Sequence, residues 1–322
     1  MSLPLVSICV PTYHHVNFIG EALRSALEQD YPNLEIIVAD DGSTDGTATI
    51  IHDYAKKHPG HIVALPSRPN QGIPGIVTNY NRALKACHGK YIAFLEGDDL
   101  YLPGKIATQV AWLESSERRV LCGHDVEAFD SGTGRILYRW SERWPLRNSG
   151  GVREVIRYQV PFATVSVMLR ASAVPSQGFD DRLRIVLDWK FWIDCLSGGG
   201  DFGYVPGIYA RHRRHPGNVT AGYFQARQDD QFVTLGLIES RHPAFVESCR
   251  FGRARLFYGM GVDHLSRGEI RAARKHFWNA YRHRARSEGK ALAALALTFL
   301  PAGLTAWLLD QLKPGFRSGG TT

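Results

Sequence analysis

The first hundred residues alternate short apolar runs with segments of helical periodicity, and this alternation limits the fold more than any other feature. The apolar runs are Leu5–Val10, Leu34–Ala39, His61–Leu65 and Tyr91–Leu95. Runs of this kind are typical of strands that are covered on both faces. Between them, apolar residues recur at helical spacing, as they do over residues 18–27. We therefore predict βαβ units that form a mainly parallel sheet with right-handed crossovers, which is an α/β fold.

The basic character of the chain is concentrated near its C-terminus. The chain has 322 residues, enough for about two domains, and a formal net charge of +7. Residues 250–290 contain 11 Arg or Lys and 3 Asp or Glu, so the rest of the chain is close to neutral. The main body therefore lacks the basic surface that nucleic-acid binding requires, and we expect no nucleic-acid partner.

Cysteine usage and the N-terminal segment both point to the cytoplasm. The 5 cysteines lie far apart and form no CxxC pair, which argues against a disulfide framework or a zinc site. The first apolar run is short and is stopped by Pro11, which is typical of a buried strand and not of a signal peptide. We therefore expect a cytoplasmic protein.

The C-terminal part is predicted to be helical and to contact a membrane. Residues 223–286 have helical periodicity, with small residues around Gly268 that resemble one tetratricopeptide-type hairpin. Residues 291–309 carry no charge, but Pro301 and Gly303 divide them. Next to the basic block, this segment predicts peripheral attachment to an anionic inner leaflet. A hairpin packed on the body is the alternative.

Two carboxylates follow the second apolar run. Asp40 and Asp41 begin the sequence Asp-Asp-Gly-Ser-Thr-Asp-Gly-Thr, and Gly42 allows a tight turn. In an open α/β sheet, ligands bind beyond the carboxyl ends of the strands, where a base or a ribose hydroxyl would meet these side chains. The alternative is an Asx-turn followed by a helix cap.

Three carboxylates follow the fourth apolar run within four positions: Glu96, Asp98 and Asp99. Like charges at this spacing are unfavourable unless a cation neutralises them. Oxygen ligands indicate a hard divalent ion, Mg²⁺ or Mn²⁺, with phosphate and water at its remaining positions. A solvated acidic turn is the alternative.

These motifs resemble the successive signatures of family 2 inverting glycosyltransferases, which have the GT-A fold. The first four are Val-Ser-Ile-Cys-Val-Pro-Thr-Tyr (6–13), Asp-Asp-Gly-Ser-Thr-Asp-Gly-Thr (40–47), Asn-Gln-Gly (70–72) and Leu-Glu-Gly-Asp-Asp (95–99). Later segments at 161–168, 178–183, 187–192 and 213–220 are similar to the acceptor side of the family. The resemblance spans residues 5–220.

The resemblance implies a fold and a domain organisation. Residues 1–220 would form the GT-A domain, whose mixed, mainly parallel sheet is flanked by helices. Residues 221–290 would form a helical extension with a basic surface. Residues 291–322 would form the apolar, membrane-associated segment and the tail.

The resemblance also implies roles for individual residues. The residues that would bind the nucleotide are Pro11, Thr12, Tyr13, Asp40, Asp41, Asn70, Gly72 and Asp98. The metal ligands would be Asp98, Asp99 and His215, and Asp188 would be the general base. Glu96, Trp140, Trp144 and Arg213 are assigned to the acceptor or the diphosphate.

Each role that lies downstream of the carboxylate motifs has an ordinary structural alternative. Asp188 fits the N-terminal turn of a helix. His215 is one of 13 histidines. Arg213 suits a solvated loop, and the two tryptophans suit core or lid packing. Two departures from the family pattern are Glu96, where Asp is usual, and Leu187, where an acidic residue is common.

The predicted reaction is the metal-dependent transfer of a sugar from a nucleoside diphosphate donor, with UDP-sugars favoured, to a hydroxyl of a glycan or lipid-linked acceptor. One base suffices for such an inversion, because a divalent metal can stabilise the diphosphate leaving group. The alternatives are a catalytically silent nucleotide-sugar-binding or scaffold protein and a nucleotidyltransferase. The nucleotidyltransferase is disfavoured because no Gly-rich phosphate loop follows the first strand.

Overall fold

The computed structural model describes residues 3–144, 149–159, 162–218, 223–283 and 289–299. Contacts within the chain define two compact units. Unit 1 consists of Met1–Val152 and Val160–Asp230, and unit 2 consists of Arg153–Gln159 and Gln231–Thr322.

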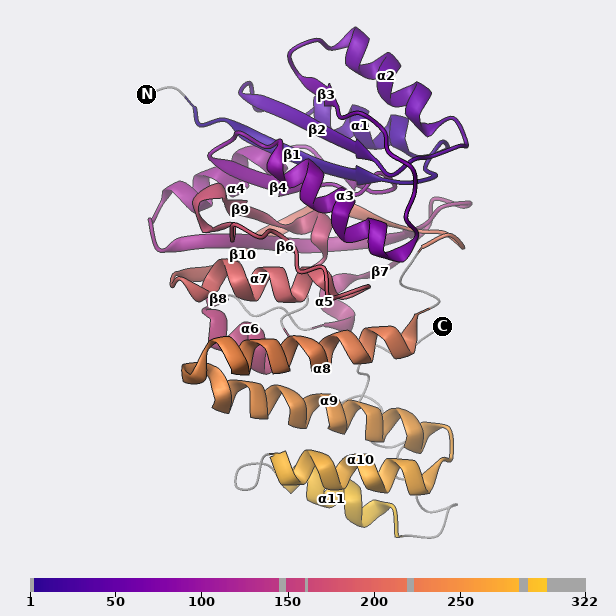
Figure 1. Ribbon diagram of the computed structural model, residues 1–322, viewed down its shortest axis with the longest axis vertical. Coiled ribbons are helices and arrows are strands. Elements are labelled where there is room, and N and C mark those ends of the chain that lie inside the picture. Colours follow the sequence, from indigo (N-terminus) through magenta and orange to yellow (C-terminus); the bar gives the residue numbers. More distant parts are fainter. Residues whose placement is uncertain (1–2, 145–148, 160–161, 219–222, 284–288, 300–322) are drawn as a thin grey trace. The chain divides into compact units, whose positions relative to one another are not determined.

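Unit 1 is built on a ten-stranded sheet (Figure 1). Its strands are β1 (Val6–Thr12), β2 (Leu34–Asp40), β3 (Ile62–Ala64), β4 (Tyr91–Phe94), β5 (Leu100–Tyr101), β6 (Arg119–Asp130), β7 (Ile136–Arg139), β8 (Ser149–Gly150), β9 (Met168–Arg170) and β10 (Asp201–Arg214). The strand order is β3-β2-β1-β4-β9-β6-β10-β5, with β7 paired to β6 and β8 paired to β10. The first four strands of this order pair in parallel, whereas β9 is antiparallel to both of its neighbours. The sheet is therefore mixed, as predicted.

The α-helices that belong to unit 1 are α1 (Ile19–Leu27), α2 (Thr47–Lys57), α3 (Ile73–Lys85), α4 (Lys105–Glu114), α5 (Trp140–Arg143) and α7 (Leu187–Ser197). Those of unit 2 are α9 (Val246–Ser266), α10 (Ile270–His283) and α11 (Gly289–Leu297), together with nearly all of α6 (Val152–Tyr158). Helix α8 (Phe224–Arg241) begins in unit 1 and continues into unit 2.

Both faces of the sheet in unit 1 are covered, as the continuous apolar runs predict. All seven residues of β1 are buried. Val6, Ile8 and Val10 belong to a core with apolar residues of α1, α2 and α4. Phe94 instead belongs to an aromatic cluster with Phe179 and two residues of α7, Phe191 and Trp192. Successive side chains of β1 and β4 point to opposite faces of the sheet, so they pack into two separate cores.

Unit 2 is helical, and α9 and α10 form the hairpin that the small-residue pattern predicts. Gly268 joins them with a φ of 76°, a conformation that favours glycine. A Cβ at Gly261 would lie 2.5 Å from the ring of Phe277, so glycine allows the two helices to approach closely. Leu265, Ala273, Phe277 and Ala294 form a core that includes α11.

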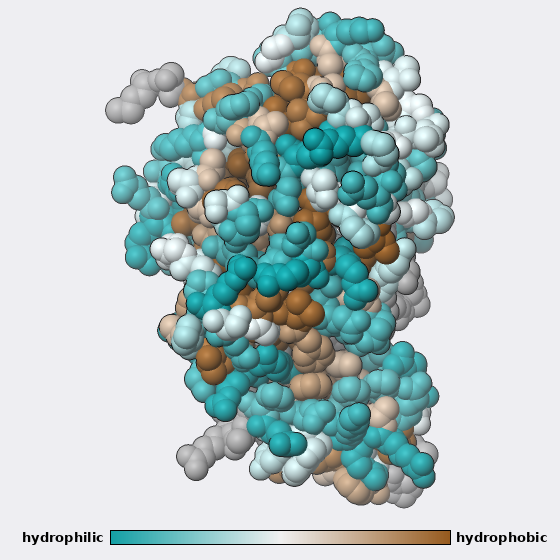
Figure 2. All heavy atoms as spheres, viewed as in Figure 1, coloured by the Kyte–Doolittle hydropathy of each residue, from teal (hydrophilic) through white to brown (hydrophobic). Residues whose placement is uncertain are grey.

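The predicted membrane segment is only partly described. Residues 300–309 and the tail that follows them lie outside the described residues. In the described ranges, no helix has the length and apolar character needed to cross a bilayer. On the face shown in Figure 2, apolar residues reach the surface in separate patches among hydrophilic ones.

Candidate active site

The loops that follow β1, β2 and β4 meet at one edge of the sheet, because β1 lies between the other two strands. The Asp41 N–H donates to the Thr12 carbonyl at 3.0 Å, and the Gly97 N–H donates to the Pro11 carbonyl at 3.1 Å. A Cβ at Gly97 would lie 2.3 Å from Thr12 Oγ1, so only glycine fits there. Both Asp-Asp motifs therefore flank the end of β1.

Asp98 lies at the centre of a compact group that contains two histidines. His215 Nε2 lies 3.0 Å from Asp98 Oδ2, and His15 Nε2 lies 3.9 Å from the same oxygen. Asn218 Nδ2 donates to Asp98 Oδ2 at 3.2 Å. Burial alone would raise the pKa of Asp98, but the His215 hydrogen bond and the nearby His15 and His212 lower it to about 2. Asp98 is therefore a carboxylate at neutral pH.

His15 is oriented by the end of β1. Its Nδ1 lies 3.0 Å from Thr12 Oγ1, which leaves Nε2 directed at Asp98. Burial lowers the pKa of His15 even though Asp98 opposes this effect, so the ring is neutral near pH 7 and its nitrogen can bind a metal. Thr12 thus contacts a histidine that sequence reasoning did not assign.

The donor set of His15, Asp98 and His215 fits a divalent metal. One nitrogen from each imidazole and one carboxylate oxygen lie within 4.8 Å of one another, and no other such group of three occurs among the described residues. Two imidazoles and a carboxylate suit Mn²⁺ better than Mg²⁺, because Mg²⁺ prefers oxygen ligands.

Asp99, the third predicted metal ligand, binds protein groups. Its Oδ1 accepts the Arg213 N–H at 2.8 Å, and its Oδ2 lies 3.1 Å from His212 Nδ1. Burial is the main cause that raises the pKa of Asp99, and this carboxylate in turn raises the pKa of His212 against the effect of burial. Asp99 therefore lies outside the group formed by His15, Asp98 and His215.

Arg213 holds this region together. Its Nε donates to the Asp98 carbonyl at 2.7 Å, and its Nη2 forms an ion pair with Glu21 at 2.5 Å. The guanidinium lies over the rings of Phe18 and Phe129, at 4.8 and 4.7 Å from their centroids. These contacts support a positioning role for Arg213, where sequence reasoning assigned it to the acceptor or the diphosphate.

Glu96 is buried near Asp98 and is not part of the group formed by His15, Asp98 and His215. The Tyr80 hydroxyl donates to Glu96 Oε1 at 2.8 Å, and Oε2 is buried without a hydrogen-bond partner. Burial, followed by the charges of Asp99 and Asp98, raises the pKa of Glu96 to about 8. Glu96 is therefore mainly protonated at neutral pH and adds little negative charge to the site.

The two carboxylates at the end of β2 have different partners. Asp40 accepts hydrogen bonds from the Ser43 N–H and hydroxyl and from the Ser67 hydroxyl, as the Asx-turn alternative predicts. Asp41 Oδ2 accepts the Asn70 amide at 2.8 Å, and its Oδ1 has no donor among the described residues. Burial and the charge of Asp40 raise the pKa of Asp41. Asp41 therefore has an oxygen available for a ligand.

The other predicted nucleotide residues lie around this pair. Asn70 Oδ1 accepts the Gly72 N–H at 2.8 Å, and Gly72 has a φ of 67°. A Cβ at Gly42 would lie 2.3 Å from the Arg68 carbonyl, so glycine is required where the two loops cross. Tyr13 is 39% exposed and stacks on His14 at 4.0 Å, which leaves its ring accessible.

Trp140 and Trp144 pack together, and Trp140 also contacts His212. Their ring centroids are 4.3 Å apart, and Trp140 meets the His212 ring edge-on at 5.9 Å. Trp140 of α5 therefore packs against a histidine that contacts Asp99, and Trp144, which follows α5, packs on Trp140.

Asp188 lies in the first turn of α7, where it accepts its neighbour's Trp189 N–H at 2.7 Å and a hydrogen bond from Thr164. Burial is the main cause that raises its pKa, against these hydrogen bonds and the nearby Arg227. Burial is the main cause that raises the pKa of Tyr80, and the charges of Glu96 and Asp188 raise it further. A buried carboxylate with a raised pKa is typical of a general base.

Sequence reasoning missed His15, His212, Tyr80 and Asn218. The pairing of β5 with β10 explains one of these, His212, because Tyr101 lies opposite Ala210 and Leu100 lies opposite Arg211. When the same antiparallel register is extended, residues 212–215 lie beside Asp98 and Asp99. The one sequence signal for His15 was its position just after the first strand.

Comparison with known families and proteins gives one consistent result. The sequence model of a family described as Glycosyl transferase family 2 matches residues 7–174. A β-1,3-glucosyltransferase of Escherichia coli, WfaP, is 37% identical over 73% of this chain and 88% of its own length. Its name gives UDP-Glc as donor and α-D-GlcNAc-diphosphoundecaprenol as acceptor. An uncharacterized glycosyltransferase of Rickettsia typhi is 40% identical, but the alignment covers 38% of this chain and 37% of that protein.

Solved structures show the same fold at lower identity. Residues 1–349 of S. aureus TarS, in complex with UDP-GlcNAc, match with a TM-score of 0.62 and 16% identity over 97% of this chain and 89% of that chain. The mannosyltransferase PcManGT from Pyrobaculum calidifontis, in complex with GDP-Man and Mn²⁺, matches with a TM-score of 0.60 and 19% identity. That match covers 99% of this chain and 84% of PcManGT.

Proposed function

The chain belongs to glycosyl transferase family 2, and we propose that it moves a sugar from a UDP-sugar to a hydroxyl group, with inversion at the anomeric carbon and with the help of a divalent metal. The observation that carries this proposal is the group formed by His15, Asp98 and His215 beside the Asp41 loop. The UDP-Glc donor in the name of WfaP and the UDP-GlcNAc in the TarS complex support the choice of uridine.

His15, Asp98 and His215 would hold the metal, for which we favour Mn²⁺. When bound, the metal supplies positive charge that stabilises the diphosphate leaving group. Asp41, Asn70 and the ring of Tyr13 would hold the nucleoside. Thr12 and Arg213 would act as positioning residues, since Thr12 orients His15 and Arg213 fixes the backbone of Asp98.

Asp188 would act as the general base. The acceptor oxygen forms a bond to the anomeric carbon as the bond from that carbon to the diphosphate oxygen breaks, and the acceptor proton moves to the Asp188 carboxylate. The raised pKa of Asp188 suits this transfer, because a base is most effective when its pKa lies nearer the working pH. Trp140 and Trp144 would flank the acceptor sugar.

The acceptor and the location are narrower proposals. We favour a glycan or lipid-linked acceptor, because the name of WfaP specifies a diphosphoundecaprenol acceptor. We also favour peripheral attachment to the inner face of the cell membrane. In support of this, Leu292 of α11 is 50% exposed and Phe299 is 67% exposed.

A calorimetric titration tests donor and metal together. Purified protein is titrated with UDP in the presence and absence of Mn²⁺, and then with GDP and dTDP. We expect metal-dependent binding with UDP preferred. A preference for another diphosphate would change the donor but keep the reaction, whereas a folded protein that binds no nucleotide would support a silent scaffold.

The variant Asp188→Asn tests the base. We expect transfer to fall about 10²–10⁴-fold while UDP affinity is retained. In the wild type, kcat/KM should fall as the pH decreases through the raised pKa of Asp188, because the protonated acid cannot accept a proton. The variant should lack this limb. Asp181→Asn, at an exposed position that precedes α7, is the matched control. Full transfer activity in Asp188→Asn would remove the base assignment.

A further inference from the structure

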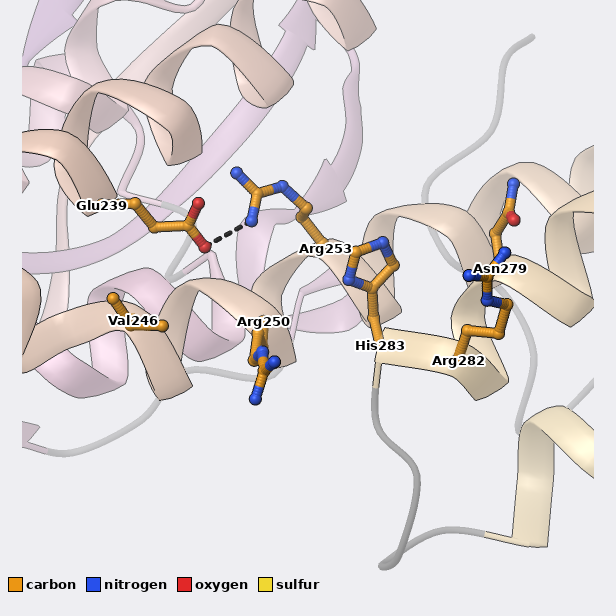
Figure 3. Close-up of a pocket in the computed structure, with 7 residues that line it drawn as sticks. All are labelled: Glu239, Val246, Arg250, Arg253, Asn279, Arg282 and His283. Atoms are coloured by element: carbon orange, nitrogen blue, oxygen red, sulfur yellow. Dashed lines mark hydrogen bonds and ion pairs between the residues drawn. The ribbon is translucent and has the colours of Figure 1, made fainter.

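Unit 2 contains a cavity of about 510 Å³ between helices α8, α9 and α10 (Figure 3). It is lined by Glu239, Val246, Arg250, Arg253, Asn279, Arg282 and His283. Val246 is the one apolar side chain in this lining. The cavity therefore suits a polar ligand and not an acyl chain.

The lining carries more positive than negative charge. Glu239 forms an ion pair with Arg253, which neutralises one of the three arginines (Figure 3). Among the described residues, Arg250 pairs with Glu247 alone, at 3.0 Å, and both side chains are mostly exposed, at 58% and 72%, so this pair is weak. Arg282 has no carboxylate partner among the described residues. Two guanidinium groups thus remain for an anion.

The charged groups around His283 are also more positive than negative. Its ring stacks on Phe257 with the centroids 5.5 Å apart. It faces Glu239 from α8, Arg250 and Arg253 from α9, and Arg282 from its own helix. Burial and the arginines lower the pKa of His283, although Glu239 opposes them. Neutral at pH 7, the ring has one N–H to donate.

We propose that this cavity binds a phosphate group, with Arg282 as its charged ligand, Asn279 and His283 as neutral hydrogen-bond donors, and Arg250 as a second positive charge at the far end of the lining (Figure 3). Guanidinium groups bind phosphate oxygens with paired N–H donors, which explains why arginine and not lysine suits such a site. The volume accommodates a phosphate together with the small polar group that carries it. This site is separate from the transfer chemistry and does not depend on the proposed reaction.

The headgroup of an anionic phospholipid is the favoured source of the phosphate. Trp278 is 49% exposed and lies one helical turn before Arg282, so both side chains lie on one face of α10. An exposed tryptophan beside an arginine is typical of a membrane interface. A soluble phosphate ester is the other source of the same chemistry.

The test uses the full-length protein and two probes. The first probe is vesicles of phosphatidylcholine with phosphatidylglycerol, compared with vesicles of phosphatidylcholine alone in a sedimentation assay. The second is inorganic phosphate, added as a competitor and also titrated directly. The variants are Arg250→Gln and Arg282→Gln. Arg271→Gln is the matched control, since it removes the same charge from an exposed position of α10 outside the cavity.

We expect each cavity variant to weaken binding to the anionic vesicles by about fivefold. Arg271→Gln should leave this binding unchanged, and inorganic phosphate should compete with the vesicles. Binding of inorganic phosphate that requires Arg282, without vesicle binding, would support the site and assign a soluble source. An equal loss in Arg271→Gln and Arg282→Gln, or a folded protein that binds neither probe, would overturn the proposal.

A second measurement does not depend on the variants. Phosphate next to His283 would stabilise its charged form, so inorganic phosphate should raise the pKa of His283 in the wild-type protein. Imidazole NMR signals followed against pH give this value directly. A His283 pKa that does not change at saturating phosphate contradicts the proposed ligand set.

Discussion

The two Asp-Asp pairs at the edge of the sheet look alike in sequence but differ in their partners. Asp40 and Asp41 bind the hydroxyl, amide and N–H groups of Ser43, Ser67 and Asn70, which are neutral. Asp98 and Asp99 instead contact histidine rings, and Asp99 also accepts the backbone N–H of Arg213. Neutral donors at the first pair suit a nucleoside, whereas the second pair is arranged to meet positive charge.

A second difference runs within each pair. Asp40 and Asp99 are the more deeply buried members, with 3% and 2% exposure, and protein groups bind both of their carboxylate oxygens. Asp41 and Asp98 are 7% and 8% exposed and direct an oxygen towards the site. The comparison suggests that one aspartate of each pair stabilises the fold and the other binds ligand, and three variants test this division.

Asp98→Asn should have the largest effect. We expect transfer to fall about 10³-fold, because the lost carboxylate is the one charged ligand in the proposed metal site. Calorimetry with Mn²⁺ should show no binding, and thermal unfolding without metal should occur at a lower temperature, because the lowered pKa of Asp98 means that its carboxylate stabilises the folded state. Retained Mn²⁺ affinity in this variant would mean that the ion binds elsewhere.

Asp99→Ala should act on stability. Its removal leaves the Arg213 N–H and the His212 ring without their acceptor, and we expect the free energy of unfolding to fall by about 3 kcal/mol. Urea unfolding of this variant is compared with that of the wild type. Unchanged stability with loss of Mn²⁺ binding would show instead that Asp99 is a metal ligand.

Asp41→Asn should have the smallest effect. The free Oδ1 of Asp41 would accept from the base, and a hydrogen bond to a charged group is worth enough to raise the KM for a UDP-sugar roughly tenfold. Asp40→Asn is the matched control, which we expect to lower the free energy of unfolding by about 1 kcal/mol and to leave KM unchanged. If Asp40→Asn raised KM and Asp41→Asn did not, the division within this pair would be reversed.

The amino-acid sequence alone predicted the first four strands, several of the helices and the positions of the carboxylates. Continuous apolar runs identify buried strands because a strand covered on both faces needs no polar side. For this reason β1, β2 and β4 were predicted within two residues at each end. The same reasoning placed both Asp-Asp pairs beyond the strand ends, and it predicted α7 and the hairpin of α9 and α10.

Only the tertiary structure decided which side chains meet. His15 joins Asp98 because β1 and β4 are neighbours, and His215 reaches the same oxygen because β10 returns past β5. Two aromatic rings and Glu21 enclose Arg213, and no local pattern encodes this enclosure. Periodicity depends on neighbours in the chain, whereas these contacts join residues up to about 200 positions apart, so the order of the strands had to be known first.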